Sequence, residues 1–239
     1  YAKRADKIVT VSNFSREDIA ATYGVSAGAI DVVHNAADQI FQPLPNPERE
    51  LVQQQYSEGK LYFVFVGTLH PRKNLLHLFK AFEHYKKATN SSAKLLVVGN
   101  RKWWPRELEE VYQGMKHKSA VVFVGRLSDQ ELAKVLASAI ALTYIPYFEG
   151  FGIPILEAFQ AGTAVITANN TSLPEIANGA AELCDAQQVE EIAIAMQKME
   201  EDIEYRESLI AKGLERAKDF SWDKSAARFW EIVTNLSSR

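Results

Sequence analysis

Two glutamates that flank a glycine-containing loop are the residues of this sequence best suited to ligand chemistry. Glu149 and Glu157 bracket the stretch EGFGIPILE (149–157), and the apolar run IALTYIP (140–146) before it has the composition of a buried strand. The glycines and Pro154 predict a turn that opens a helix, with Glu157 in its second turn. The predicted order is strand, loop with one carboxylate, glycine-rich turn, and helix with a second carboxylate.

This arrangement suits a phosphate that carries hydroxyl groups on either side. The N-terminus of a helix offers unpaired backbone N–H groups and a partial positive charge, which favour phosphate. Carboxylates repel phosphate, so Glu149 and Glu157 need hydroxyl partners, and a phosphate flanked by hydroxyls describes a nucleotide-sugar. Two alternatives stay open. The pair could be a loop acid and an unrelated acid that compensates the helix dipole, or a glycosidase acid/base couple, which would leave the glycine-rich helix start without a role.

The loop GTLHPRKN (67–74) follows another predicted strand and could bind the same phosphate. Gly67 would allow close approach of the backbone, while Arg72 and Lys73 would supply charge-assisted hydrogen bonds at the carboxyl edge of the sheet. An ordinary strand–helix loop with two solvated cations explains the same residues equally well.

The stretch VVFVGRLSDQEL (121–132) predicts a strand that ends in glycine and leads into a capped helix. Backbone groups around residues 124–127 could meet a nucleobase, with Leu132 packed beneath it. A structural turn between strand and helix is an equal interpretation. Ser172, in NTSLPEI (170–176), either lies along the same cleft edge or belongs to a plain turn.

Apolar, β-rich runs alternate with segments of helical period, which is typical of a parallel sheet with crossover helices on both faces. The sequence therefore predicts an α/β protein with a Rossmann-like sheet. Ser15 with Asp18, and Ser128 with Glu131, have the spacing of capping boxes, and Gly24 is expected to end the first helix. The predicted strands are Ile8–Val11, Ile30–Val33, Tyr62–Val66, Leu95–Val98, Val121–Val124, Ile140–Tyr144 and Ala164–Thr167.

The composition excludes several classes of protein. The 239 residues are 47% hydrophobic, enough for one large or two modest cores, and the net charge of −3 gives no sign of a nucleic-acid partner. Cys184 is the single cysteine and the five histidines lack ligand spacing, so no disulfide and no metal site are predicted. No apolar run reaches the roughly 18 residues of a membrane span. We expect a cytoplasmic protein, with the inner face of the membrane as one option.

Two features bear on domain organisation. The stretch FQPLPNPERE (41–50) concentrates three of the eight prolines, so residues 41–60 are predicted to form a linker or domain boundary. The sequence also opens at Tyr1 without a methionine, directly on a buried-looking strand. We therefore expect a longer parent chain.

Several of these segments resemble one known family. EGFGIPILEAFQAGTAVITANNTSLPEI (149–176) strongly resembles the donor-binding half of glycosyltransferase family 4, whose members are retaining enzymes of GT-B fold. VTVSNFSREDI (9–19) and VVHNAADQIFQP (32–43) resemble the end of that family's N-terminal domain, GTLHPRKN its diphosphate loop, and FSWDKSAARF (220–229) its closing helix. The resemblance covers essentially the whole chain.

The resemblance implies a role for each matching residue. Lys73 would contact the donor diphosphate with Arg72 beside it, and Glu157 would bind the ribose hydroxyls. Glu149 would hold hydroxyls of the transferred sugar and position it, without acting as a nucleophile. These enzymes use no metal ion or other cofactor, so positive side chains and the helix dipole stabilise the departing diphosphate. Further donor contacts are expected from Gly67, Thr68, Val124, Arg126, Leu132, Gly150, Phe151, Gly152, Ile153 and Pro154.

The resemblance also implies two domains. Residues 1–45 would be a remnant of the N-terminal acceptor domain with its linker, and residues 46–239 a Rossmann-like nucleotide-sugar-binding domain, one half of a GT-B fold. The glycan or lipid-linked acceptor would bind the missing part, so this chain alone is expected to bind nucleotide weakly and to transfer nothing. Two positions depart from the family pattern: Thr68 replaces a frequent basic residue, and Asn35-Ala36 replaces Asn-Gly.

The donor is expected to be GDP-mannose, because PRKN combined with SLPE resembles members that use it, while UDP-sugars remain open. A nucleotide-sugar epimerase or a phosphorylase is an enzymatic alternative. A non-catalytic nucleotide-binding or interaction module is a third hypothesis, since fold alone does not determine function.

Overall fold

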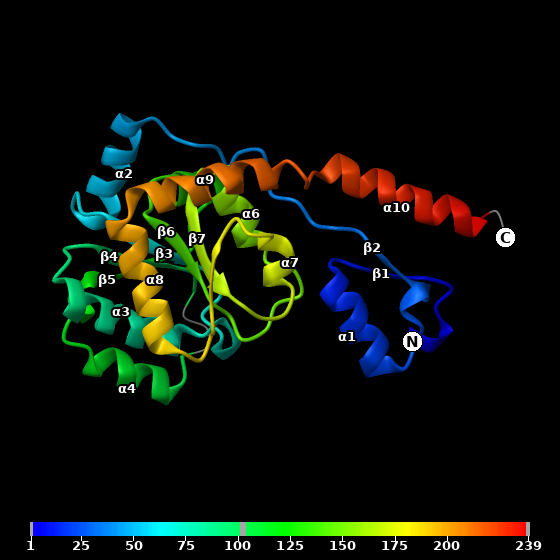
Figure 1. The fold of residues 1–239 in the computed structure, drawn as a ribbon, viewed down its shortest axis with the longest axis horizontal. Helices are drawn as coiled ribbons and strands as arrows, with labels where there is room; N and C mark the ends of the chain where they lie inside the picture. The colour runs from blue at the N-terminus through cyan, green and yellow to red at the C-terminus, as the bar shows by residue number, and fades with distance from the viewer. Residues whose placement is uncertain (1, 101–103, 238–239) are drawn as a thin grey trace.

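The computed structural model describes residues 2–100 and 104–237 and confirms the predicted α/β fold (Figure 1). The main body contains a six-stranded parallel sheet with the strand order β5-β4-β3-β6-β7-β8. Five of its strands lie within one residue of their predicted bounds at each end, and β8 was not predicted. The strands are β3 (Tyr62–Val66), β4 (Lys94–Val98), β5 (Val121–Gly125), β6 (Ala141–Tyr144), β7 (Ala164–Ala168) and β8 (Glu182–Cys184).

Burial explains which strands the sequence could predict. All five residues of β3 and of β7 are buried, so both strands are continuous apolar runs, as expected when helices cover both faces. The hydroxyl of Tyr62 donates a hydrogen bond to the carbonyl of Val135 at 2.7 Å, which satisfies a polar group in the core. Strand β8 has three residues and is partly exposed, so it carries no comparable pattern.

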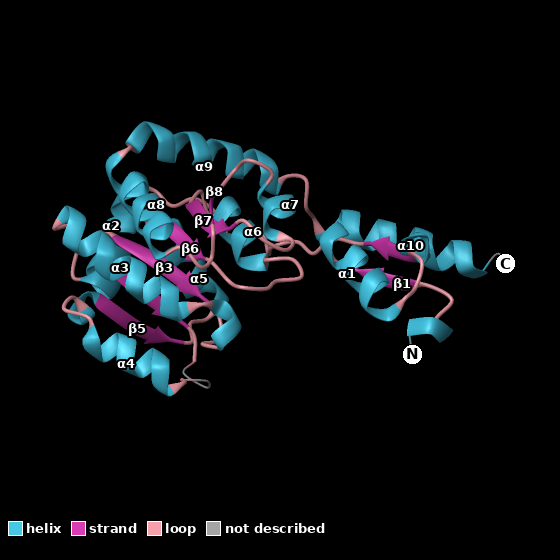
Figure 2. Cartoon of the chain, turned by 60° about the horizontal axis from the view of Figure 1, so that its bottom comes forward, coloured by secondary structure: helices cyan, strands magenta, loops and turns pink. Residues whose placement is uncertain are grey.

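Helices lie on both faces of this sheet (Figures 1 and 2). Helix α3 packs against α4 and α8, and helix α6 packs against α5 and α9. The helices of the main body are α2 (Asn46–Ser57), α3 (Leu75–Thr89), α4 (Arg106–Gly114), α5 (Asp129–Ala137), α6 (Ile153–Gln160), α7 (Leu173–Ala177), α8 (Val189–Glu201) and α9 (Ile203–Ala217).

A small lobe built from both ends of the described chain lies beside the main body (Figure 1). Its elements are a parallel pair of strands, β1 (Ile8–Thr10) and β2 (Ile30–Val32), and two helices, α1 (Asn13–Tyr23) and α10 (Trp222–Ser237). Helix α10 is tied to the β2 side, because Ser225 donates to the carbonyl of His34 at 2.6 Å and Arg228 pairs with Asp31 at 2.9 Å. The predicted strand–helix–strand unit is therefore present and is held by the C-terminal helix.

Two predictions about local structure were wrong. Residues 46–57 form helix α2 instead of a linker, and this helix packs against α5, β4 and β5. Pro45 precedes the helix and Pro47 lies in its first turn, where no backbone N–H is needed, so neither proline opposes it. Helix α1 is capped by Ser12, whose side chain accepts from the N–H of Ser15, so Ser15 lies inside the helix. The capping box of Ser128 and the helix end at Gly24, with a φ of 61°, are confirmed.

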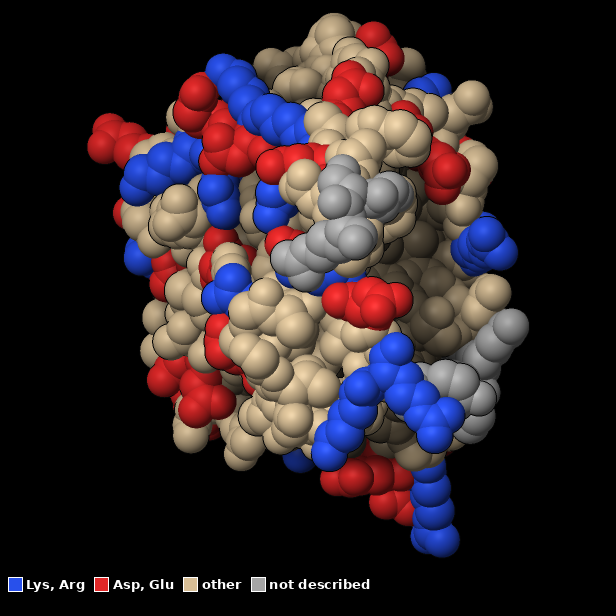
Figure 3. Space-filling model, turned by 90° about the vertical axis from the view of Figure 1, so that its right-hand side faces the viewer, with Lys and Arg blue, Asp and Glu red and all other residues tan. Residues whose placement is uncertain are grey.

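On the side of the molecule that shows the small lobe, basic and acidic side chains are interspersed (Figure 3). Within residues 2–100 and 104–237, no helix combines the length and apolar character needed to cross a bilayer. The same residues contain no group of three or more His, Cys, Asp or Glu side chains arranged to hold a metal ion.

Candidate functional site

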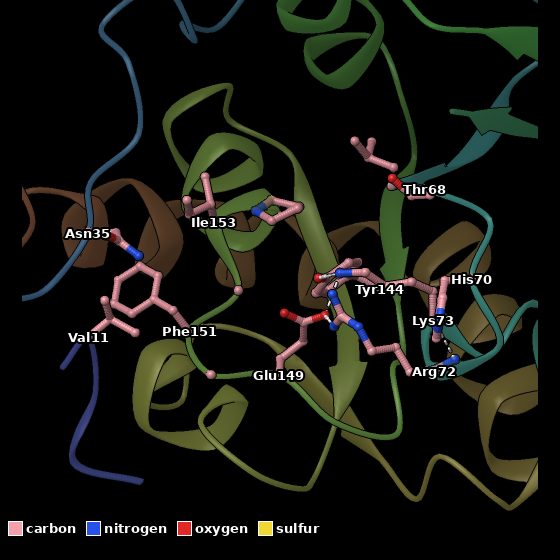
Figure 4. A pocket seen from close by; sticks show the side chains of 15 residues that line it. Val11, Asn35, Thr68, His70, Arg72, Lys73, Tyr144, Glu149, Phe151 and Ile153 are labelled. Atoms are coloured by element: carbon pink, nitrogen blue, oxygen red, sulfur yellow. Dashed lines mark hydrogen bonds and ion pairs between the residues drawn. The ribbon is translucent and has the colours of Figure 1, made fainter. Parts of the chain in front are cut away.

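The candidate site lies where the strand order of the main sheet reverses. Strands β3 and β6 are neighbours, but the chain continues from β3 toward β4 on one side and from β6 toward β7 on the other. The loops after β3 and β6 therefore diverge and leave a crevice at the carboxyl edge of the sheet. A cavity of about 590 Å³ occupies this crevice (Figure 4). Of the predicted residues, those that line it are Gly67, Thr68, Arg72, Lys73, Glu149, Gly150, Phe151, Gly152, Ile153 and Pro154.

Glu149 pairs with both cations of the loop after β3. Its Oε1 atom accepts hydrogen bonds from Nη1 of Arg72 and from Nζ of Lys73 (Figure 4). The Lys73 and Glu149 side chains are only 11% and 12% exposed, whereas that of Arg72 is 47% exposed. Burial lowers the pKa of Lys73, and the hydrogen bond to Glu149 offsets part of this shift. Glu149 is thus the counter-ion of a nearly buried ammonium group.

Tyr144, at the end of β6, also holds Lys73. Its hydroxyl oxygen accepts a hydrogen bond from Nζ of Lys73, and this nitrogen lies 4.8 Å from the centre of the ring. Burial, reinforced by the charge of Glu149, raises the pKa of Tyr144, so the phenol stays protonated. The sequence does not point to this residue, because a tyrosine that ends an apolar strand has the pattern of a core residue.

Asn74 joins the loop after β3 to the loop after β6, and it too was missed. Its backbone adopts the left-handed conformation, with a φ of 59°. Its buried side-chain amide donates to the carbonyls of Ile145 and Ala186 at 3.0 and 2.7 Å, and the N–H of Tyr147 donates to the carbonyl of Arg72 at 2.9 Å. These bonds fix the distance between the cations and Glu149.

Helix α6 begins at the cavity, as its glycine-rich start predicted. Gly152 precedes it with a φ of 102°, a conformation that side chains rarely adopt. A Cβ atom at this position would lie 2.9 Å from Cδ2 of Leu173, so the turn requires glycine. The backbone of residues 150–154 can therefore approach a ligand closely.

Glu157 lies in the second turn of α6, as predicted, and is half-buried. The described residues offer no hydrogen-bond partner for its carboxylate. Burial, with a smaller contribution from the charge of Asp129, raises the pKa of Glu157 to about 7. A poorly hydrated carboxylate without a protein partner is suited to accept hydrogen bonds from ligand hydroxyls.

A second cavity, of about 330 Å³, adjoins the first at Val66, Gly67 and Thr68. Its lining includes the predicted Arg126 and Leu132, together with Asp129 from the start of α5. Val124 and Glu157 are not among the residues that line either cavity. Val124 packs against the hydrophobic core.

Side chains hold every backbone carbonyl of the loop at residues 146–151. Ser172, which the sequence placed either at the cleft edge or in a plain turn, is buried and donates to the carbonyls of Glu149 and Phe151 at 2.9 and 3.2 Å. The donors to the other carbonyls are Asn170 for Pro146 and Tyr147, Arg72 for Phe148, and Ser12 and Ser15 for Gly150. The loop that carries Glu149 is therefore fixed on both sides.

The small lobe takes part in this scaffold through the first turn of α1. Ser12 and Ser15 donate to the carbonyl of Gly150 at 2.6 and 3.0 Å. Glu175 of α7 in turn accepts from the N–H groups of Asn13 and Phe14 at 2.9 and 3.1 Å. Burial alone would raise the pKa of Glu175, but these donors outweigh it and hold the pKa below its usual value.

Replacement of Glu175 by glutamine is expected to loosen the small lobe from the Glu149 loop. The substitution removes a charged acceptor at the N-terminus of α1, which costs about 1–2 kcal/mol. Hydrogen exchange should become faster at the amides of Asn13, Phe14 and residues 149–151, while α3 and α8 keep wild-type rates. Because the pKa of Glu175 is depressed, its contacts in the wild type should be fully present at pH values above the usual pKa of a glutamate. They should weaken as the pH falls through the lower pKa of the folded state. Unchanged exchange at residues 149–151 would contradict the coupling.

A comparison with known protein families agrees with this fold and with a site at the point where the strand order reverses. The chain belongs to the family described as glycosyl transferases group 1, which it matches over residues 47–216.

Two relatives that are similar in sequence are bacterial mannosyltransferases. The chain is 32% identical to O-antigen chain mannosyltransferase B of Escherichia coli over 220 residues, which are 92% of this chain and 58% of that protein. It is 31% identical to the O-antigen chain mannosyltransferase RfbU of Salmonella typhimurium over 179 residues, or 74% of this chain and 46% of that protein. The chain thus spans about half the length of these curated relatives.

Solved structures share the fold. The chain superposes on Anabaena HepE in complex with UDP-glucose with a TM-score of 0.85 and 18% identity, covering 100% of this chain and 65% of that one. It superposes on sucrose-phosphate synthase from Thermosynechococcus elongatus with a TM-score of 0.83 and 21% identity, covering 98% and 59% of the two chains. These likenesses confirm the prediction of one half of a GT-B fold.

Proposed function

We propose that this chain is the donor-binding part of a retaining glycosyltransferase of family 4, which transfers mannose from GDP-mannose to a glycan or lipid-linked acceptor. The observation that carries the proposal is the meeting of Lys73, Arg72 and Glu149 in a cavity that continues into a second one. Cations beside a carboxylate fit a diphosphate beside a hydroxyl-bearing sugar.

The two cavities accommodate the two halves of such a donor. The diphosphate would lie over Gly67 and Thr68, where the cavities meet, within reach of Lys73 and Arg72. The sugar would occupy the first cavity beside Glu149 and the backbone of residues 150–154. The nucleoside would occupy the second cavity, between the backbone at Arg126 and the side chain of Leu132, with its ribose hydroxyls directed to Glu157.

The chemistry proposed for this site uses charge and position. As the bond from sugar to diphosphate breaks, negative charge develops on the leaving oxygens, and the donors of Lys73 and Arg72 stabilise it without a metal ion. Glu149 holds the sugar hydroxyls and takes no part as a nucleophile. In the proposed front-face mechanism, which retains the anomeric configuration, the leaving phosphate accepts the proton of the attacking acceptor hydroxyl.

Mannose is favoured because several relatives are named as mannosyltransferases, among them two O-antigen enzymes and the MMP alpha-(1->4)-mannosyltransferase of Mycolicibacterium hassiacum. The length of these relatives supports a longer parent protein, in which residues 1–45 end the acceptor domain and residues 46–239 bind the donor.

Calorimetric titration with GDP, UDP and ADP tests this proposal. Selective binding of GDP by the wild-type chain, weakened in Lys73→Ala and Glu157→Ala, is the expected result. A folded chain that binds none of the three would overturn the donor-site assignment. Because the acceptor pocket is assigned to another part of the parent protein, this chain alone should transfer no sugar. Sugar transfer by this chain alone would refute that assignment of the acceptor pocket.

A further inference from the structure

The two cations proposed to bind the diphosphate already share one counter-ion, Glu149, in the free chain. Arg72 and Lys73 donate to the same oxygen of Glu149, and the pair of Lys73 with Glu149 is nearly buried. Partly buried pairs are screened less by solvent than surface pairs, so this contact is a real competitor for any incoming anion. A diphosphate that binds these cations therefore competes with Glu149 for them.

Displacement has different consequences for a nucleoside diphosphate and for a complete nucleotide-sugar. When a nucleoside diphosphate takes Lys73 and Arg72, the carboxylate of Glu149 loses its cations and gains no donor, which is costly at 12% exposure. A nucleotide-sugar brings sugar hydroxyls into the same cavity, and these can donate to the released carboxylate. The cations then have the diphosphate as their partner, and Glu149 has the sugar hydroxyls, so no group is left unpaired.

We infer that Glu149 is an internal competitor of the diphosphate, so that the site favours the complete donor and disfavours the nucleoside diphosphate left after transfer. The inference rests on the proposed function. In this arrangement, Glu149 returns to Lys73 and Arg72 once the sugar has left, and thereby helps to release the product.

Tyr144 makes such an exchange possible without loss of Lys73 from the site. The phenol hydroxyl and the ring both contact the ammonium group. Lys73 therefore keeps one neutral partner while it changes its anionic partner.

Glu149→Gln tests the inference, because glutamine keeps the shape of the side chain and removes the competing charge. Inorganic pyrophosphate and GDP should bind this variant at least about tenfold more tightly than the wild type, whereas GDP-mannose should gain less or lose affinity. The ratio of the GDP to the GDP-mannose dissociation constant should therefore fall, by about tenfold if the affinity for GDP-mannose does not change. Glu204→Gln, at an exposed position of α9, makes the same change in net charge and should leave all three affinities unchanged.

The outcomes separate this inference from the proposed function. Unchanged or weaker pyrophosphate binding by folded Glu149→Gln overturns the competition. Tighter pyrophosphate binding in a chain that binds no nucleotide supports the competition and overturns the donor-site assignment. If Glu149→Gln does not fold, Glu149→Asp is the deciding variant. The shorter side chain keeps the negative charge that the cations need, but moves the carboxylate away from Lys73 and Arg72 and so weakens the competition. Pyrophosphate affinity about threefold above wild type then supports the inference, and unchanged affinity overturns it.

Discussion

Lys73→Ala is expected to weaken binding of a nucleoside diphosphate by about 10- to 100-fold, the loss of one charged hydrogen bond in a nearly buried site. It is also expected to lower sugar transfer by the longer parent by about 10²–10³-fold, because the lysine acts on charge that develops in the transition state. The substitution leaves Glu149 with Arg72 as its remaining cation, so the carboxylate repels the diphosphate more strongly than in the wild type.

Calorimetry with GDP measures the first effect, and thermal unfolding shows whether the variant is folded. Lys212→Ala is the matched control, since Lys212 is exposed on α9 and the substitution removes the same charge. Wild-type affinity in folded Lys73→Ala would exclude this lysine from the phosphate site.

Glu157→Gln is expected to stabilise the fold and weaken nucleotide binding, with opposite dependence on pH. The pKa of Glu157 is raised from 4.5 to about 7, first by burial and then by Asp129. Between these pH values the unfolded chain releases a proton that the folded chain retains, so the free energy of unfolding falls as the pH rises and then levels off. The full loss is about 2–3 kcal/mol. The glutamine variant should lack it, and should therefore gain that stability at pH 8 and almost none at pH 4.

Ligand binding should show the reverse trend. In the proposed donor site the ionised carboxylate would accept hydrogen bonds from two ribose hydroxyls, so wild-type GDP affinity should rise as the pH increases through about 7. Glu157→Gln should bind GDP about tenfold more weakly at pH 8, without this pH step. Urea unfolding and calorimetry from pH 4 to pH 8 measure both effects, with Glu204→Gln as the control. A pH-independent difference in stability would show that Glu157 has the same pKa in the folded and the unfolded chain, and would contradict the raised pKa.

The strands and the order of the site elements were predictable from the sequence because they depend on local patterns. Continuous burial makes β3 and β7 unbroken apolar runs, and the glycine-rich start of α6 needs a left-handed residue at Gly152. These signals lie within a few neighbouring residues. The same holds for the capping box at Ser128, which is closed by Glu131 three positions later.

Local pattern failed where a residue's role depends on distant partners. No residue near Tyr144 in the sequence indicates that its hydroxyl accepts a hydrogen bond from Lys73. Likewise, no residue near Ser15 indicates that its hydroxyl donates to the carbonyl of Gly150 in the main body. The prolines around Pro47 are equally compatible with a linker and with a helix start, and tertiary packing of α2 decided between them.

The sequence alone determined the parallel α/β fold and which acids and cations could face a donor, because residue type and periodicity encode both. Tertiary structure alone decided that Arg72 and Lys73 share one oxygen of Glu149. It also decided that helix α1 holds the loop of that glutamate. Both facts depend on the reversal of strand order between β3 and β6 and on the return of the chain to the small lobe, which bring together side chains more than seventy residues apart.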